Sequence, residues 1–248
     1  MGKKFHKPKK KIIRKEQFNV PASELPIIEH ERDFRTSFHW RVLRIMAEFV
    51  DGWNFLADVR KSVTIFGSAR FKETSPWYHE ARKLGKMLTD NGFSVVTGGG
   101  PGIMEAANRG ATEGGGSGDS FGLNIKLPFE QRENQYVEKG CGFHYFFVRK
   151  VMLSYSAQAY VYFPGGFGTL DELTELITLI QTKKISVTIP MILVGRKFWQ
   201  PFLDWVDRTL IDDLKVVAPG DRKIYQLVDS AEEALQIIKG SPERVEFG

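Results

Sequence analysis

Residues 164–172 read Pro-Gly-Gly-Phe-Gly-Thr-Leu-Asp-Glu, between a short apolar run and a helical pattern. The apolar run, Ala159–Phe163, has the length of a buried strand, and apolar residues recur with helical spacing from Leu173 to Ile180. A strand, a glycine-rich turn and a helix start together form an anion cradle, because backbone N–H groups point outward and the helix dipole favours negative charge. Glu172 would then lie beside whatever carries the phosphate. The stretch therefore predicts chemistry on a phosphorylated small molecule.

On both sides of this stretch, apolar strand patterns alternate with helical patterns. The alternation predicts an α/β fold, a doubly wound and mostly parallel sheet with helices on both faces, which is a modified Rossmann fold. Ligands bind such sheets beyond the carboxyl ends of the strands, where the strand order reverses. Glycine-rich turns follow Phe66, Thr97 and Phe163, so we expect the three turns to converge on one crevice. The predicted strands are 63–66, 93–97, 120–127, 160–163, 190–194 and 224–228, the predicted helices are 77–90, 103–112, 146–157, 169–181, 198–214 and 231–239, and residues 128–143 are predicted to form an irregular loop.

Composition divides the chain into three segments. Residues 1–28 are predicted to be a basic, disordered tail, residues 29–61 a long amphipathic helix, and residues 62–248 the Rossmann-like nucleotide-binding domain. The first 15 residues hold eight of the 35 basic residues and no acidic one, which leaves 27 basic against 30 acidic residues elsewhere. A solubilising arm is the favoured interpretation of the tail. Nucleic-acid binding is the less favoured alternative, because no other basic patch supports it.

Several classes of protein are excluded by what the sequence lacks. No run approaches about 18 consecutive apolar residues, so no membrane-spanning helix is expected. No apolar region follows the cationic N-terminus, so no signal peptide is expected. Cys141 is the one cysteine, which excludes an internal disulfide and indicates a reducing, cytoplasmic location. Without a Cys or His cluster, no metal site is predicted.

The candidate catalytic groups each have a second interpretation. Thr169-x-x-Glu172 has the spacing of a capping box, in which Glu172 bonds back to the helix start, and spacing alone does not decide between cap and catalytic carboxylate. Arg149 and Lys150 fit a solvated helix face, or an arginine that reaches a phosphate bidentately. The stretch Gly98–Gly102 matches the dinucleotide fingerprint only loosely. Its four glycines in five residues favour a close approach of the backbone to a ligand.

Taken together, these elements resemble the LOG family, cytokinin riboside 5′-monophosphate phosphoribohydrolases often labelled "possible lysine decarboxylase". The resemblance covers roughly residues 62–240 and rests on Gly98–Asn108, Arg149-Lys150 and the P-G-G-x-G-T-x-x-E element at 164–172. It implies that Arg149 and Glu172 are the catalytic pair. It also implies a homodimer or higher assembly, and neither a metal nor an organic cofactor. The implied substrate-binding residues are Ser68, Gly99, Gly100, Lys150, Gly165, Gly166, Gly168 and Thr169.

The expected function is hydrolysis of the N-glycosidic bond of a nucleoside 5′-monophosphate, either AMP or a cytokinin riboside 5′-monophosphate. The products would be the free base and ribose 5-phosphate. The alternative is a carrier that binds a nucleotide or the molybdenum cofactor without hydrolysis, and only the enzyme needs Arg149 and Glu172 to face one cavity. The long N-terminal helix, the basic tail, the C-terminal extension and Glu105 depart from short family members, which leaves the base specificity open. Nothing in the sequence supplies the electron sink that an amino-acid decarboxylase requires.

Overall fold

The computed structural model describes residues 37–59, 61–126, 133–155 and 157–243 of the chain. The chain divides into two compact units, residues 1–41 and 42–248. In the first unit the described residues open helix α1 (Phe38–Leu56), and the tail predicted over residues 1–28 lies outside the described residues. None of the described helices combines the length and apolar character needed to cross a bilayer.

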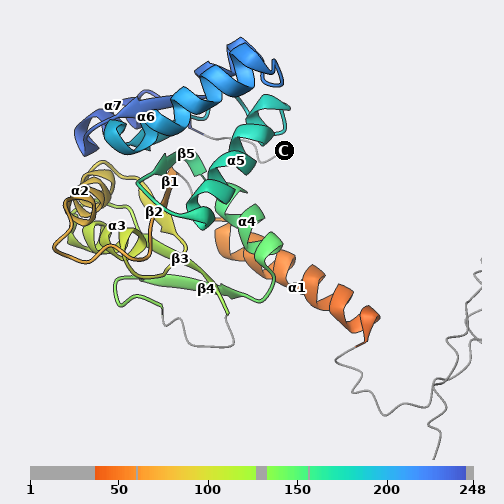
Figure 1. Ribbon diagram of the computed structural model, residues 1–248. Helices are drawn as coiled ribbons and strands as arrows, with labels where there is room; N and C mark the ends of the chain where they lie inside the picture. Colours follow the sequence, from red (N-terminus) through yellow and green to blue (C-terminus); the bar gives the residue numbers. More distant parts are fainter. Residues whose placement is uncertain (1–36, 60, 127–132, 156, 244–248) are drawn as a thin grey trace, which may run out of the picture. The chain divides into compact units, whose positions relative to one another are not determined.

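The described part of the second unit is a seven-stranded parallel sheet with helices on both faces (Figure 1). In sheet order the strands are β4 (Lys139–Phe143), β3 (Ser120–Ile125), β2 (Ser94–Thr97), β1 (Ser62–Phe66), β5 (Ala157–Tyr162), β6 (Met191–Val194) and β7 (Tyr225–Val228). The helices are α2 (Pro76–Asp90), α3 (Ile103–Glu113), α4 (Phe146–Tyr155), α5 (Phe167–Gln181), α6 (Arg196–Trp205) and α7 (Ala231–Lys239), with a π-helical segment η4 (Val206–Asp213) and a 3-10 segment η5 (Pro219–Lys223). The predicted doubly wound α/β fold is confirmed.

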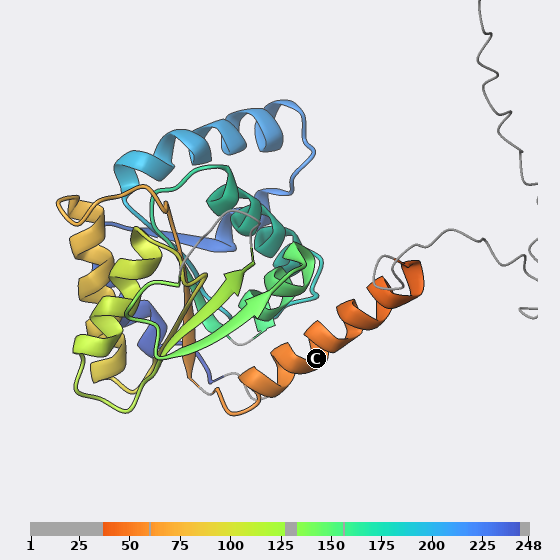
Figure 2. The ribbon, with the colours of Figure 1, turned by 90° about the horizontal axis from the view of Figure 1, so that it is seen from below.

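Alternating side chains on the central strands divide the core into two layers. On β5, Tyr160 and Tyr162 belong to one layer, whereas Ala159 and Val161 belong to the other, because successive side chains of a strand point to opposite faces. The first layer contains side chains of α4, α5 and α6, and the second contains side chains of α2, α3 and α7. Figures 1 and 2 show α2 and α3 on one side of the sheet and α4 and α5 on the other. Strands covered on both faces appear as continuous apolar runs, so the sequence pattern identified them.

The strand order reverses between β1 and β5. The chain first adds β2, β3 and β4 on one side of β1, and then adds β5, β6 and β7 on the other. A crevice is expected outside the carboxyl ends of the strands at this point. The glycine-rich turns after β1 and β5 leave the sheet there, side by side, and the turn after β2 follows next to them.

Some element ends are shifted, since β5 begins at Ala157 instead of residue 160 and α1 ends at Leu56 instead of residue 61. Three further elements differ from the sequence prediction. Strand β4 lies inside the predicted irregular loop, because its Lys-Gly-Cys-Gly-Phe sequence at the sheet edge is mostly exposed and gives no apolar run. Helix α5 begins at Phe167, two residues before the predicted start. The helix predicted over 198–214 is α-helical only to Trp205, after which η4 continues with π-helical geometry.

Candidate active site

A crevice with a volume of about 880 Å³ opens at the carboxyl ends of β1 and β5. Its walls come from the turns after these two strands, the first turns of α5, and side chains of α4. Most of its lining side chains are apolar or aromatic, and the charged ones are Arg70, Arg149, Asp171 and Glu172. Within the described ranges, no group of three or more His, Cys, Asp or Glu side chains is placed to hold a metal ion. The crevice therefore contains a small number of charged side chains among mostly apolar ones.

The turn between β5 and α5 forms one wall of this crevice. Gly166 is the N-cap of α5, and the first helical hydrogen bond runs from the N–H of Leu170 to its carbonyl at 3.0 Å. The N–H groups of residues 167–169 precede that bond and stand at the positive end of the helix dipole. A Cβ atom added at Gly166 or Gly168 would meet no atom within 4 Å. Neither position has a φ that favours glycine, so nothing within the described protein requires glycine there. The bare backbone leaves this surface free for an anion.

Glu172 lies one turn further along α5 and is buried at 9% exposure. Among the polar side-chain atoms of the described residues, its Oε2 is a buried oxygen with no hydrogen-bond partner. Burial raises the pKa of this carboxyl to about 7, although the positive charges of Lys150 and Arg149 oppose the shift. An unpartnered buried carboxylate is costly, which makes it a candidate for a functional group.

The capping-box interpretation of Thr169 and Glu172 is wrong. Because α5 begins at Phe167, Thr169 lies inside its first turn and is not the N-cap. Its side chain packs against Gly165, where an added Cβ would overlap the Thr169 hydroxyl. Glu172 is thus free of the helix start and faces the crevice.

Arg149 reaches the crevice from α4. Its Nε donates a hydrogen bond of 2.6 Å to the carbonyl oxygen of Leu123, within β3. Its guanidinium lies against Gly98, where an added Cβ would overlap Nη2. Burial lowers the pKa of Arg149, and the nearby charge of Glu172 opposes this shift. The structure therefore brings the predicted pair, Arg149 and Glu172, to one crevice, with opposite charges close enough to affect each other.

Protein groups occupy the space around the turn after β2. The N–H of Gly99 donates to Oγ1 of Thr97 at 2.9 Å, and Nδ2 of Asn134 donates to the carbonyl of Gly100 at 3.0 Å. Gly99 has a φ of +68°, and an added Cβ there would overlap the amide of Asn124. Gly99 and Gly100 do not belong to the crevice lining. Their predicted role in substrate binding has no geometric support in this arrangement.

The turn after β1 connects the crevice walls. The N–H of Ser68 donates to the carbonyl of Pro164 at 3.0 Å, which ties this turn to the cradle before α5. The Ser68 carbonyl accepts from the N–H of Ile103 at 3.1 Å. Gly102, with a φ of +70°, allows this approach, because a Cβ there would overlap the Ser68 carbonyl oxygen. Ser68 itself lines the crevice, as predicted.

Lys150 follows Arg149 in sequence but does not line the crevice. Its ammonium forms ion pairs with Asp171 at 2.9 Å and Glu175 at 2.8 Å, both on α5. The residues predicted for the site that do line the crevice are Ser68, Arg149, Gly165, Gly166, Gly168, Thr169 and Glu172.

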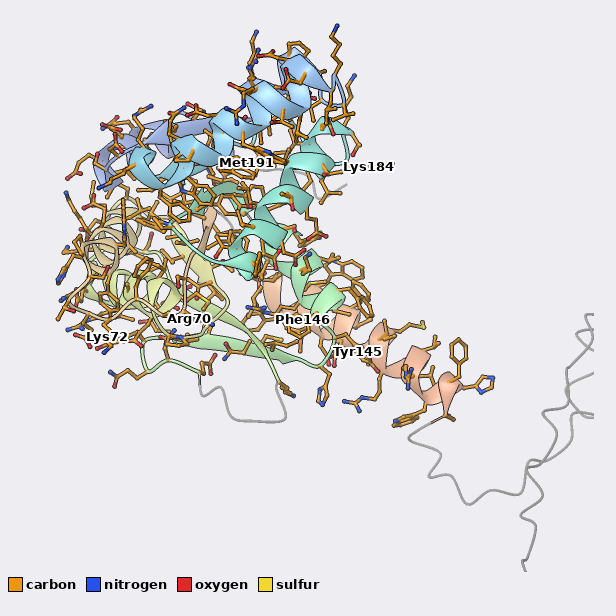
Figure 3. All side chains as sticks on the ribbon, viewed as in Figure 1. Arg70, Lys72, Tyr145, Phe146, Lys184 and Met191 are labelled. Atoms are coloured by element: carbon orange, nitrogen blue, oxygen red, sulfur yellow. The ribbon has the colours of Figure 1, made fainter. Side chains whose placement is uncertain are left out.

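Sequence reasoning missed the aromatic walls of the crevice. Its lining includes Trp77 at the start of α2, Phe146 at the start of α4 and Phe198 on α6. Figure 3 labels Arg70 and Phe146, which reach the crevice from different elements. Phe167 is 92% exposed at the first position of α5, where hydrophobic burial does not explain it. Aromatic faces of this kind stack on planar rings. No periodic signal marks them, because they come from four separate elements.

Comparison with known families and curated proteins places the site among related sequences. A family model described as "Possible lysine decarboxylase" matches residues 104–238, more than half of the chain, and this range includes Arg149 and Glu172. The chain is 29% identical over 177 residues to the cytokinin riboside 5′-monophosphate phosphoribohydrolase LOG of Oryza sativa subsp. japonica, covering 70% of each protein. It is also 29% identical over 174 residues to the pyrimidine/purine nucleotide 5′-monophosphate nucleosidase of Escherichia coli (strain K12), covering 66% of this chain and 38% of that protein.

A solved structure shares the architecture at lower sequence identity. The molybdenum cofactor carrier protein from Chlamydomonas reinhardtii is 20% identical, with a TM-score of 0.53, over 73% of this chain and 96% of that one. This likeness supports the doubly wound fold and carries no information on activity.

Proposed function

Because the chain belongs to the LOG family, whose model is described as "Possible lysine decarboxylase", we propose that it hydrolyses the N-glycosidic bond of a nucleoside 5′-monophosphate. The products are the free base and ribose 5-phosphate, and the proposed substrates are AMP or a cytokinin riboside 5′-monophosphate. One observation carries the proposal: the buried carboxylate of Glu172, with an unpartnered oxygen, faces the same crevice as Arg149. In a protein that only binds a phosphate, a buried negative charge beside the phosphate would not favour binding.

The first turn of α5 is the proposed phosphate site. Its N–H groups and helix dipole favour an anion, and Gly166 and Gly168 leave their backbone uncovered. Ser68 and Thr169 line the adjacent wall and offer hydroxyl groups. Binding energy from the phosphate, which does not react, orients the ribose carbon that does.

Glu172 is the proposed general base and charge stabiliser. Cleavage of a sugar–base bond develops positive charge on the ribose, and a carboxylate beside the ring stabilises it. Glu172 takes a proton from water as the water oxygen bonds to C1′. The bond from C1′ to the base nitrogen breaks, and that nitrogen takes a proton from solvent. A pKa of about 7 suits a base that works near neutral pH.

Arg149 is proposed to contact the phosphate or ribose and to favour the ionised form of Glu172. Its hydrogen bond to the Leu123 carbonyl fixes the guanidinium at one end, which leaves its remaining N–H groups for the substrate. The guanidinium stays charged despite burial, because its pKa starts far above neutral.

The decarboxylase description does not fit this site. An amino-acid decarboxylase that uses pyridoxal phosphate needs a lysine that forms a Schiff base at the reaction centre. The crevice lining in the described residues contains no lysine, and Lys150 next to it is held in two ion pairs.

A homodimer is the proposed assembly, and the cytoplasm the proposed location. From Val42 onward α1 packs against α4, where Gly52 meets Met152, yet both helices leave large apolar side chains exposed. These are Val42, Leu43, Met46, Val50 and Trp53 on α1, and Phe146, Phe147 and Val151 on α4. A second copy would cover this surface beside the crevice, which Phe146 also lines. Analytical ultracentrifugation tests the assembly, and a wild-type monomer at micromolar concentration contradicts it.

Incubation with a panel of nucleoside 5′-monophosphates, with detection of free base, tests the proposed reaction. We expect equal amounts of base and ribose 5-phosphate from at least one purine nucleotide, and none from the matching nucleoside, which lacks the phosphate. Tight nucleotide or molybdenum-cofactor binding without released base would establish the carrier alternative instead.

A further inference from the structure

Lys150 ties helix α4 to helix α5 beside the candidate catalytic pair. Its ammonium lies 2.9 Å from Oδ2 of Asp171 and 2.8 Å from Oε2 of Glu175. The Lys150 side chain is 17% exposed and Glu175 35%, so this pair is partly shielded from solvent, whereas Asp171 is 62% exposed and its pair with Lys150 is screened like a surface pair. Asp171 and Glu175 are four residues apart and therefore lie on one face of α5, one turn after the other. One lysine thus holds two successive turns of the helix that carries Glu172.

We propose that Lys150 is a positioning residue that fixes Glu172 opposite Arg149, rather than a residue that contacts the substrate. The inference rests on the proposed function, because it concerns the same reaction. Lys150 directly follows Arg149 on α4, and Asp171 directly precedes Glu172 on α5. An ion pair between the two neighbours therefore sets the relative position of the two reacting side chains.

Helix geometry explains why adjacent residues have separate tasks. Successive residues of an α-helix point about 100° apart, because about 3.6 residues make one turn. Arg149 consequently faces the crevice and the Leu123 carbonyl, whereas Lys150 faces α5. The resemblance to the LOG family implied a substrate contact for Lys150, but Lys150 does not line the crevice, and its ammonium is already engaged by two carboxylates, Asp171 in the crevice lining and Glu175 outside it.

Lys150 also supplies positive charge to Glu172. The charged groups that act on Glu172 are Lys150 and Arg149 from α4, and Glu175 and Asp171 from its own helix. Tyr162 of β5 also interacts with it but stays neutral, since burial raises its pKa further. Burial lowers the pKa of Lys150, but the hydrogen bonds to Glu175 and Asp171 together outweigh it and raise the pKa, so Lys150 remains charged across the neutral range. Without Lys150, Arg149 alone among these groups would oppose the two negative charges of Asp171 and Glu175.

The experiment compares Lys150→Met with Lys150→Arg over pH 6 to 9, with AMP as substrate and free base as readout. Loss of the charge should move the acid limb of kcat to higher pH by about one unit. Turnover of Lys150→Met at pH 7 should then fall roughly fivefold, with much of the loss regained at pH 9, because ionisation of Glu172 limits the rate only on the acid side. The KM should change less than about twofold, and Lys150→Arg should restore the wild-type profile. Lys86→Met, which removes an i,i+4 ion pair with Asp90 on α2, is the matched control without effect.

Glu175→Gln provides the opposite test. It removes a negative neighbour of Glu172 outside the crevice lining, so the acid limb should move to lower pH. A general loss of stability cannot produce shifts of opposite sign in the two variants. This arm also keeps the proposal testable if Lys150→Met does not fold.

Three outcomes overturn the inference. The first is a KM raised tenfold or more in Lys150→Met with an unchanged pH profile, which would make Lys150 a substrate contact. The second is a Lys150→Met variant that matches wild type at every pH. The third needs no turnover: the pKa of the Glu172 carboxyl, followed by ¹³C NMR and assigned with Glu172→Gln, is equal with and without Lys150. If the wild type hydrolyses no nucleotide, the proposed reaction fails, but this NMR comparison still decides whether Lys150 acts on Glu172.

Discussion

The two glycine-rich turns, Gly98–Gly102 after β2 and Gly165–Gly168 at the start of α5, look alike in sequence and differ in what occupies the space beside them. In the first turn, added Cβ atoms would overlap Arg149 at Gly98, Asn124 at Gly99 and the Ser68 carbonyl at Gly102. In the second turn, an added Cβ would overlap Thr169 at Gly165, but Gly166 and Gly168 face open space. In the first turn, protein atoms occupy the space that a side chain at the glycines would need. In the second turn, the space beside Gly166 and Gly168 is available to a ligand.

The buried polar groups near the two turns differ in the same way. Beside the β2 turn, the Asn108 side chain accepts from Thr97 at 2.6 Å and Asn134 at 3.0 Å, and donates to Ser120 at 2.9 Å. Beside the α5 turn, Glu172 keeps a buried oxygen without a partner. A satisfied network stabilises the fold, whereas an unsatisfied carboxylate lowers stability and is retained for function. We therefore expect mutations near the β2 turn to affect mainly stability, and mutations near the α5 turn mainly activity.

Glu172→Gln should have the largest effect of all on activity. It removes the proposed base while keeping the size of the side chain, so turnover should fall by about 10²-fold or more. Nucleotide binding should largely remain, because the phosphate site is elsewhere on α5. Steady-state kinetics with AMP and calorimetric binding measure the two effects separately. If this variant kept wild-type turnover, Glu172 would not have the proposed chemical role, and the α5 turn would no longer differ from the β2 turn in this respect.

The same variant should be more stable than wild type at high pH. The pKa of Glu172 in the folded protein is about 7, above its ordinary value of 4.5, so the folded state holds a proton that the unfolded state has released between these values. Stability of the wild type is therefore lost as the pH rises from about 4.5 to 7, by an amount of up to about 3 kcal/mol. Glu172→Gln should show little difference from wild type at pH 4, and its full gain at pH 8, in urea denaturation.

Glu113→Gln is the control with the opposite sign. Ion pairs with Arg82 and Arg109 lower the pKa of Glu113, so it stabilises the fold above its ordinary pKa, and this contribution is lost as the pH falls. The variant should be less stable than wild type at pH 7, and the difference should shrink toward acid pH. Parallel pH profiles for Glu113→Gln and Glu172→Gln would contradict the assignment of burial as the cause at Glu172.

The fold was predictable because its central strands are buried on both faces. The runs that became β1, β2, β5 and β6 are fully buried, and such runs stand out in any sequence. Strand β4 was not predictable, since an exposed edge strand with two glycines has no hydrophobic pattern. Convergence of the turns after β1 and β5 followed from the strand order of a doubly wound sheet.

The site was predictable only in part. The positions of Arg149 and Glu172 followed from strand ends and from the resemblance to the LOG family. The proposed role of Lys150 could not be predicted, because the sequence shows that Lys150 adjoins Arg149 but not which residues its side chain contacts. The glycines at 99 and 100 were hidden for a similar reason: a sequence records a missing side chain and not what fills the space.

Gly102→Ala tests the packed side of the comparison. Its φ of +70° is unfavourable for alanine, and the new Cβ would overlap the backbone of Ser68 and Ala69. We expect a loss of stability of about 2 kcal/mol, from strain and from displacement of the turn after β1. Thermal and urea denaturation measure this loss. A variant as stable as wild type would mean that the turn can yield, and that the packing around it is not tight.

Gly168→Ala tests the open side and should have the smallest effect on the fold. Alanine favours the helix, and its Cβ would point into empty space, so stability should rise by roughly 0.5 kcal/mol. The same methyl group would cover part of the proposed phosphate site, so the KM for AMP should rise about tenfold while kcat changes little, as expected for lost binding shared by ground and transition states. Gly115→Ala is the matched control, because its Cβ also meets no atom within 4 Å but lies outside the crevice lining. It should leave the KM unchanged. If Gly168→Ala also leaves the KM unchanged, the open space beside α5 is not where the phosphate binds, and the contrast between the two turns describes packing alone.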